Sequence, residues 1–288
     1  MADYRKMWEE LGMDVELHDQ LCAVLPQAFG DVFLSQENRP DSMDYYNMVV
    51  ADIHGIRPAE LIEHQKKGGK VFGTFCVYVP DEIVFAADAI ATGLCGGSQF
   101  WVPDGEKVLP KNMCPLVKAS VGARLGRTCP FFRIADMFIG ETTCDGKKKM
   151  YELLNELKRT HILHLPQGRD RAYEREGWYE ECRLLKEELE NFYGITITDD
   201  DLRAAVRRRN RLRAAQLEMF ALQANQPAAM SGVDLMSTMF AGTFSFDIEA
   251  YTQQLEQKVV KLREAYGAGE RPVAADAKRI LITGCPVG

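Results

Sequence analysis

Apolar and polar positions follow two different periods between residues 70 and 170, and the alternation of these periods is the main structural signal. Residues 70–79 form a β-branched and aromatic run of strand length, and Pro80-Asp81-Glu82 is a helix-start signal. Apolar residues then recur at helical spacing from Ile83 to Ile90. Because strands that alternate with helices form crossover units, the pattern predicts an α/β domain with a mostly parallel sheet. The remaining predicted elements are strands at 99–102, 135–141 and 162–165, and helices at 114–125 and from about 144.

Long helical segments replace this alternation after residue 170. We predict helices over 173–193 and 247–266, and a third over 198–225, where Thr198 and Asp201 form a pattern like a capping box. These segments contain few strand signals, so they indicate a helical connector rather than a continuation of the sheet.

An apolar run near the end of the chain, 278–283, has the character of a strand, and Gly284-Cys285-Pro286 follows it as a turn. Such a strand needs a crossover helix and a parallel neighbour to bury it. We therefore expect a truncated chain that lacks most of a second α/β domain. The predicted parts are an N-terminal helical segment (1–55), an α/β domain (56–170), a helical connector (171–272) and the first strand of a second α/β domain (273–288).

The composition is that of a globular protein, with 46% apolar and 27% charged residues in a chain of 288. The net charge of −7 argues against nucleic acid and anionic membranes as partners. The N-terminus is charged throughout, and the longest nearly apolar run, 83–95, is shorter than the ~20 residues of a membrane-spanning helix. We expect a soluble, cytoplasmic protein.

The chain contains eight cysteines, which the cytosol would keep reduced. Several lie near strand ends or helix starts, so their thiolates could converge on one crevice at the carboxyl edge of the sheet. Plain burial is the alternative, and we favour it for Cys22 and Cys182. Zinc is disfavoured, because there is no C-x-x-C pair and the five histidines are scattered. Iron–sulfur clusters tolerate widely spaced cysteines. The group in question is Cys76, Cys95, Cys114, Cys129 and Cys144.

Two of these cysteines have a context that favours a metal-bound thiolate. Cys114 and Cys144 lie at predicted helix starts, where free amides and the helix dipole stabilise a negative sulfur. The lysines at 147–149 are either a solvated helix face or contacts for a phosphate-bearing ligand. His54 and Glu82 are weaker candidates for proton transfer, since a lone histidine is more often simply hydrogen-bonded. The arginine-rich stretch at 203–213 is interpreted as a solvated face balanced by nearby acidic residues.

Four segments with these cysteines resemble the 2-hydroxyacyl-CoA dehydratase and benzoyl-CoA reductase superfamily, and within it the double-cubane cluster reductases most of all. They are GTFCVYVPDE (73–82), NMCPLVK (112–118), GRTCP (126–130) and GETTCDGKKK (140–149). The resemblance covers roughly residues 45–288, where TGCP (283–286) matches the strand that opens the family's second domain. It implies a Rossmann-like fold for the α/β domain.

The resemblance also implies an oxygen-sensitive, anaerobic iron–sulfur reductase. A separate ATPase with its own 4Fe-4S cluster would deliver low-potential electrons, and small unsaturated molecules would be reduced at a double-cubane cluster. Cys114, Cys129 and Cys144 would bind the cluster, and we predict that they converge at the carboxyl edge of the sheet. The protein would be a homodimer. Catalytic residues stay unassigned, as do the roles of Cys76, Cys95 and Cys285.

Two alternatives remain open. In the dehydratase branch the chain would be a subunit of a 2-hydroxyacyl-CoA dehydratase that acts on an acyl-CoA, with Cys114 and Cys144 as two of three ligands to one 4Fe-4S cluster. Cys129 favours the reductase, because a larger cluster needs more thiolates. Outside enzymes, the chain would be an electron-transfer or cluster-carrier module.

Overall fold

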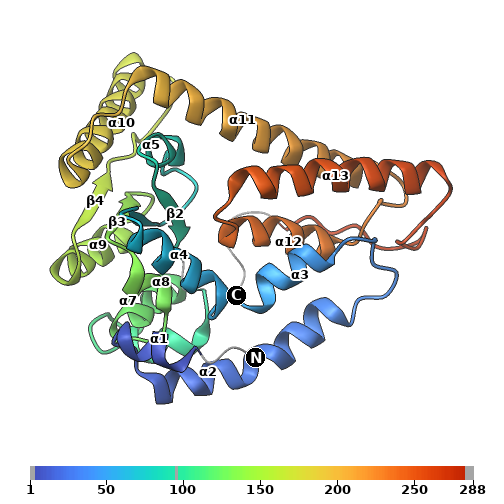
Figure 1. The fold of residues 1–288 in the computed structure, drawn as a ribbon, viewed down its shortest axis with the longest axis horizontal. Helices are drawn as coiled ribbons and strands as arrows, with labels where there is room; N and C mark the ends of the chain where they lie inside the picture. Colours follow the sequence, from blue (N-terminus) through green and yellow to red (C-terminus); the bar gives the residue numbers. More distant parts are fainter. Residues whose placement is uncertain (1–3, 95–96, 283–288) are drawn as a thin grey trace. The chain divides into compact units, whose positions relative to one another are not determined.

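The computed structural model describes residues 4–94 and 97–282 of the chain (Figure 1). They form two compact units, each with its own core. The first unit comprises the described residues of 1–21 and 54–205, and the second those of 22–53 and 206–287. Cys95, Cys285 and the TGCP segment lie outside the described residues, so the expectations for them stay expectations.

The first unit is built on a fully parallel sheet in the order β2-β1-β3-β4. The strands are β1 (Val71–Thr74), β2 (Ile90–Gly93), β3 (Met137–Glu141) and β4 (Thr160–Leu163). The two central strands are paired in register, with Phe72 of β1 opposite Met137 of β3. This sheet and its crossover helices confirm the predicted α/β, Rossmann-like class.

Helices cover both faces of the sheet because alternate side chains of each strand point to opposite faces. On one face, Phe72 packs in a core cluster with Leu185 and Leu189 of α10 (Ala172–Tyr193). On the other face, the ring of Phe138 lies 5.6 Å from that of Phe132 in α8 (Pro130–Ile134). Tyr151, which is fully buried, joins this second core from α9 (Asp145–Leu157).

The remaining helices of this unit are short, apart from two that run on into the second unit. They are α1 (Arg5–Glu10), α4 (Ile56–Lys66), α5 (Asp81–Ala86), the 3₁₀-helix η2 (Gln99–Trp101), α6 (Val102–Gly105) and α7 (Pro115–Leu125). The two continuous helices at the boundary are α2 (Val15–Phe29) and α11 (Asp199–Ala221).

Many predicted elements are confirmed. Helix α7 starts after Cys114, α9 starts after Cys144, and α10 ends at Gly194, which takes the left-handed conformation at φ 71°. The Thr198 capping pattern is also present, since the Thr198 hydroxyl accepts a hydrogen bond from the amide of Asp201 at 3.2 Å.

One predicted strand was too long, and one strand was not predicted. The first predicted strand ends at Thr74 rather than Val79, because Cys76 adopts φ 81° and turns the chain out of the sheet. The second strand is β2, at 90–93, where the apolar spacing favoured a helix; Asp88, at φ 51°, ends α5 before it. An aspartate tolerates this left-handed conformation better than most residues.

The predicted strand at 99–102 is instead the 3₁₀-helix η2 followed by α6. The Ser98 hydroxyl accepts a hydrogen bond from the amide of Phe100 at 3.2 Å, which starts the turn. Its backbone then lies directly against α7, since a Cβ atom on Gly122 would be 1.8 Å from the carbonyl oxygen of Trp101. This close packing between backbones is a tertiary contact that the apolar pattern did not reveal.

The predicted strand at 278–283 is not formed in its described part. Residues 278–282 have no regular secondary structure, and Ile280, Leu281 and Ile282 are 83%, 87% and 76% exposed. An apolar run without a sheet neighbour has no partner for its backbone, which explains why strand propensity alone did not produce a strand here.

The second unit is helical. Its core contains Tyr46 of α3 (Asp44–Ala51) and Tyr251 of α13 (Ile248–Gly267), and the Tyr251 hydroxyl donates a hydrogen bond to the carbonyl of Thr238 at 2.8 Å. Arg211 of α11 pairs with Glu249 and Glu256 of α13, which agrees with the interpretation of the arginines as a balanced face. The elements are the π-helix η1 (Gly30–Leu34), α3 (Asp44–Ala51), η3 (Leu222–Ala224), α12 (Gly232–Ala241), η4 (Gly242–Phe244) and α13 (Ile248–Gly267).

Candidate functional site

Each of the three predicted ligand cysteines is the N-cap residue of a helix in the first unit. Cys114 precedes α7, Cys129 precedes α8 and Cys144 precedes α9. Proline follows Cys114 and Cys129 directly, and proline fits the first position of a helix because it lacks the amide hydrogen that would be unpaired there. Amides at a helix start and the positive end of the helix dipole both favour a thiolate at such a position.

Cys144 lies in a loop that a buried ion pair holds in place at the carboxyl end of β3. Glu141, the last residue of β3, is fully buried, and its carboxylate accepts hydrogen bonds from the amide of Thr143, at 3.0 Å, and from the ammonium of Lys147. The Tyr151 hydroxyl accepts from the Glu141 amide at 3.2 Å. The Sγ atom of Cys144 accepts from the amide of Lys147 at 3.4 Å. The loop therefore presents its thiol from a fixed backbone.

The lysines of this turn are all paired within the chain. Lys147 contacts Glu141, Lys148 lies 3.0 Å from Asp145, and Lys149 lies 2.5 Å from Glu152. The ion pair of Lys147 is almost buried, whereas the other two are exposed and contribute little to stability. Of the three, Lys147 has the clearest structural task, which is to neutralise Glu141.

The starts of α7 and α9 pack against each other at Gly146. A Cβ atom at this glycine would lie 3.2 Å from Sδ of Met113, 3.6 Å from Cγ2 of Val117 and 3.8 Å from Sγ of Cys144. Met113 directly precedes Cys114, so the contact brings together the two helix starts that carry Cys114 and Cys144. Glycine permits this approach because it has no side chain.

The thiols differ in their surroundings. Cys114 and Cys144 are exposed, whereas Cys129 is 7% exposed. Burial raises the pKa of the Cys129 thiol to about 11, although the amides of Phe132 and Phe131 act in the opposite direction. Cys182 packs beside the core cluster, as expected for a buried cysteine, and burial raises its pKa to about 11 as well.

Cys76 belongs to the same edge of the sheet as Cys144. It follows β1 by two residues, Cys144 follows β3 by three, and β1 and β3 are adjacent parallel strands. Its φ of 81° is unusual for a residue with a side chain, and such backbone strain is often found at functional sites. Cys76 is one of the five clustered cysteines of the sequence, and its role stays unassigned.

The thiols of Cys114, Cys129 and Cys144 do not form a compact ligand set for a single ion within the described part of the chain. The compact set found there consists of His18, Cys22 and His54. This set was not predicted from the sequence, in which the five histidines are scattered. The available signal was the i, i+4 spacing of His18 and Cys22, which places both on one face of a helix.

The fold defines a Rossmann-like α/β protein with cysteines at the starts of three helices. The chain belongs to the 2-hydroxyglutaryl-CoA dehydratase, D-component family, whose model matches residues 76–288.

Curated relatives agree with this assignment. A putative dehydratase subunit of Escherichia coli is 38% identical over 79% of this chain and 59% of its own length. A benzoyl-CoA reductase subunit of Thauera aromatica is 26% identical over 65% of this chain and 48% of its own length. The beta subunit of (R)-2-hydroxyglutaryl-CoA dehydratase from Acidaminococcus fermentans is 24% identical over 78% and 58%.

The chain thus spans roughly half to three fifths of the length of these relatives. The relatives that it matches carry the names of dehydratase and reductase subunits. Among the helices of the described residues, we find none with both the length and the apolar character needed to cross a membrane.

Proposed function

We propose that the chain is the iron–sulfur-binding part of an acyl-CoA dehydratase or a related reductase, and that Cys114 and Cys144 are two of its cluster ligands. The observation that carries this proposal is the packing at Gly146, which joins two helix starts whose N-cap residues are cysteines. Both thiols are exposed. The family supports the proposal, because its relatives carry the names of dehydratase and reductase subunits.

The residues present suit a cluster in kind, though two thiols are fewer than a cluster needs. Cysteine thiolates are the usual ligands of iron–sulfur clusters, and amide hydrogen bonds to their sulfurs help to set the reduction potential. A bound cluster would supply one-electron chemistry at this edge of the sheet. The protein's own part is to hold the Cys144 sulfur through the Lys147 amide, and to fix the loop through the buried Glu141.

The electron donor is proposed to be a separate ATPase that carries its own 4Fe-4S cluster, and the chain is proposed to work as a homodimer or with a second subunit. These partners follow from the family resemblance. A cluster in a partly apolar crevice resists added negative charge, so its reduction needs a strong donor. Coupling to ATP hydrolysis would meet that need, and the substrate would be an acyl-CoA or another small unsaturated molecule.

The role of Cys129 distinguishes the two branches. A reductase with a double-cubane cluster would use Cys129 as a further ligand, and its N-cap position resembles those of Cys114 and Cys144. Cys129 is buried whereas Cys114 and Cys144 are exposed, and this difference favours the other branch, a dehydratase-type subunit with one 4Fe-4S cluster. Of the two, the dehydratase type has the better structural support.

The test is to purify the chain without oxygen, reconstitute it with iron and sulfide, and measure both elements together with the electron paramagnetic resonance spectrum after reduction. About four irons per chain are expected for a single 4Fe-4S cluster, and about twice that for a double cubane. The reduction is then repeated with the partner ATPase and ATP, and with a non-hydrolysable ATP analogue as the control. Absence of a sulfide-containing cluster would overturn the proposal. Sustained reduction without ATP hydrolysis would show that the electron donor does not depend on ATP.

A further inference from the structure

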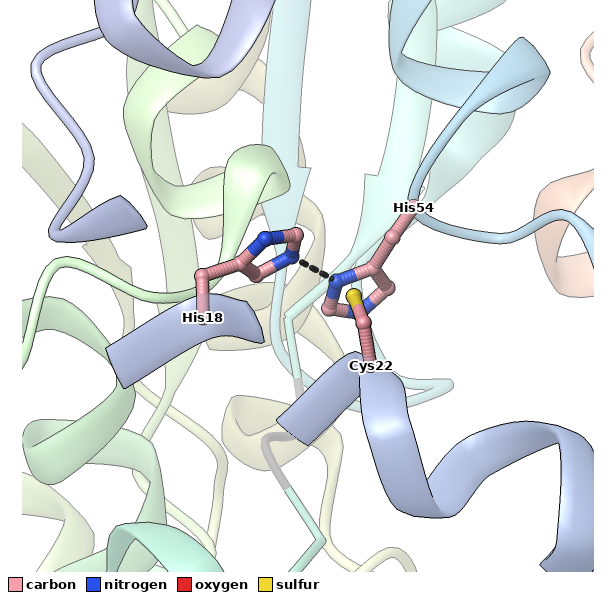
Figure 2. Close-up of side chains that lie close together, drawn as sticks. All are labelled: His18, Cys22 and His54. Atoms are coloured by element: carbon pink, nitrogen blue, oxygen red, sulfur yellow. Dashed lines mark hydrogen bonds between the residues drawn. The ribbon is translucent and has the colours of Figure 1, made fainter. Parts of the chain in front are cut away.

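A second group of soft ligands lies apart from the cysteines at α7, α8 and α9. His18 and Cys22 belong to α2, and His54 lies two residues before α4. Figure 2 shows the three side chains close together, and one potential ligand atom of each lies within 4.8 Å of the other two. His18 Nε2 and His54 Nδ1 share a hydrogen bond of 2.6 Å.

The group depends on the first compact unit and on one continuous helix. The chain leaves the first unit after Leu21 and returns to it at His54, so both histidines belong to that unit. Cys22 follows His18 by one turn of α2, which runs without a break from Val15 to Phe29. Residues four apart in a helix lie on the same face, so the helix itself holds Cys22 beside His18.

The surroundings hold the two imidazoles in fixed orientations. His18 is fully buried, and the ring of Trp8 packs against it edge-on at 4.3 Å. The indole of Trp8 also donates a hydrogen bond to the carbonyl oxygen of His54 at 2.8 Å. These contacts fix the positions of both rings before any ion binds.

We propose that His18, Cys22 and His54 bind one divalent metal ion of the zinc type. Histidine nitrogen and cysteine sulfur are both usual ligands of Zn²⁺, and three protein ligands leave a fourth position for water. Zinc bonds of ~2.0–2.1 Å to nitrogen and ~2.3 Å to sulfur place tetrahedral ligand atoms about 3.3–3.6 Å apart. The two facing nitrogens, now 2.6 Å apart, must separate by about 0.7–1 Å, and the sulfur must move closer by at most about 1.3 Å. Side-chain rotation alone provides such shifts.

Binding releases one proton per ion. The Cys22 thiol loses its proton to water when it becomes a ligand. In the hydrogen bond between the histidines, one of the two facing nitrogens carries the hydrogen. When the metal binds, the proton of this ring moves to the second nitrogen of the same ring. The facing nitrogen then has a lone pair for the metal. The net reaction exchanges one thiol proton for one metal–sulfur bond, and no oxidant or reductant is needed.

An ion held in this way would join residues that are 36 positions apart in the sequence. A link that closes a long loop stabilises the folded chain, and a ligand that binds only the folded state raises the unfolding temperature by mass action. The site therefore acts as a structural clip on the N-terminal segment.

The test uses the full chain with Cys114→Ser and Cys144→Ser, so that no cluster absorbs light, and titrates it anaerobically with Co²⁺ and then with Zn²⁺. We expect one Co²⁺ per chain, with the visible bands of a tetrahedral ion and a near-ultraviolet thiolate-to-cobalt band. Zn²⁺ should displace Co²⁺, release one proton per ion into weak buffer and raise the unfolding temperature. Co²⁺ should also quench the fluorescence of Trp8, which is in ring contact with His18.

The decisive variant is Cys22→Ser in the same background, with Cys182→Ser as the matched control, because Cys182 is another half-buried cysteine in a helix. We expect Cys22→Ser to abolish the thiolate-to-cobalt band and to weaken Zn²⁺ binding at least about tenfold. Cys182→Ser should leave both unchanged. The circular dichroism spectrum of each variant establishes that it is folded. A thiolate band that persists in Cys22→Ser, or no Co²⁺ binding at all, would overturn the proposal.

Discussion

Two helix starts in the α/β unit carry the same local signal and yet differ in their thiols. Both α8 and α9 begin after an N-cap cysteine. The α9 cysteine, Cys144, is exposed and follows the carboxyl end of β3, whereas the α8 cysteine, Cys129, is buried in the segment that leads into the start of β3. Ligand crevices in parallel sheets form beyond the carboxyl ends of strands. Because Cys144 lies beyond such an end and is exposed, it is the stronger ligand candidate of the two.

The largest expected effect is on cluster iron. Because Cys114 and Cys144 are proposed as ligands, Cys114→Ser and Cys144→Ser should each lose most of the iron that the reconstituted wild-type chain retains. Cys129→Ser should retain nearly all of it if its burial keeps it out of the cluster. Iron and sulfide analysis after anaerobic desalting measures this, with Cys182→Ser as the control for loss of an unrelated thiol.

The contrast between Cys129 and the two proposed ligands would be wrong if Cys129→Ser lost as much iron as the other two variants. Cys129 would then be a ligand despite its burial, and the double-cubane reductase would become the better description of the chain. Circular dichroism must show that Cys129→Ser is folded, because the substitution places a hydroxyl in a buried position.

The next effect is on the stability of the helix that carries Cys114. Gly122→Ala in α7 would place a Cβ atom 1.8 Å from the carbonyl oxygen of Trp101, which is backbone and has little freedom to move. We expect a loss of about 2–4 kcal/mol in the free energy of unfolding, as for other overpacked sites. Urea denaturation measures it.

The matched control is Gly177→Ala in α10, where nothing lies within 4 Å of the added atom. This substitution should raise the free energy of unfolding by up to about 1 kcal/mol, because alanine favours helix more than glycine does. Equal effects of the two substitutions would mean that the packing of α7 against η2 is not as close as the structure has it.

The rates at which the thiols are alkylated should also differ between the exposed cysteines and Cys129. In the cluster-free chain at pH 8, iodoacetamide should modify Cys114 and Cys144 at least about tenfold faster than Cys129, because alkylation needs an accessible thiolate. Since the pKa of Cys129 is raised to about 11, its thiol stays protonated at pH 8 and gains thiolate only as the pH rises toward that value. Peptide mass spectrometry over time measures the rates. Equal rates would show that Cys129 is not protected.

The α/β class, the parallel sheet and the starts of α7, α9 and α10 could be predicted from the sequence because they depend on local signals. Prolines, acidic residues and cysteines mark the helix starts, and Gly194 marks a helix end. The short strand β2 could not be predicted in this way. Its four residues continue the apolar spacing of α5, and only the left-handed conformation of Asp88 separates the two elements.

The positions of the candidate cysteines at helix starts could be predicted from the sequence, but the burial of each thiol could not. The helix-start positions of Cys114 and Cys144 follow from sequence, but the burial of Cys129 depends on tertiary packing around α8. His18 and His54 are 36 positions apart in the sequence, and no local pattern predicts a contact between them. Convergence of all three cysteines stays a prediction, for which the iron analysis is the direct test.

The smallest expected effect concerns the contact that brings Cys114 and Cys144 together. In Gly146→Ala, the new methyl group would lie 3.2 Å from Sδ of Met113, which is closer than most such contacts. The flexible methionine can move aside, and alanine favours the helix, so the change in the free energy of unfolding should be less than about 1 kcal/mol.

The coupling between the two positions is more informative than either value alone. Met113→Ala should relieve the contact, so the double variant Gly146→Ala with Met113→Ala should be more stable than the sum of the single changes by about 0.5–1 kcal/mol. Urea denaturation of all four chains measures this coupling, and Gly177→Ala with Met113→Ala is the control pair, for which additivity is expected. If the coupling is zero, Met113 does not pack on Gly146 in solution. There would then be no structural reason to treat the two exposed thiols as one site. The contrast between the cysteines that precede α9 and α8 would be one of exposure alone.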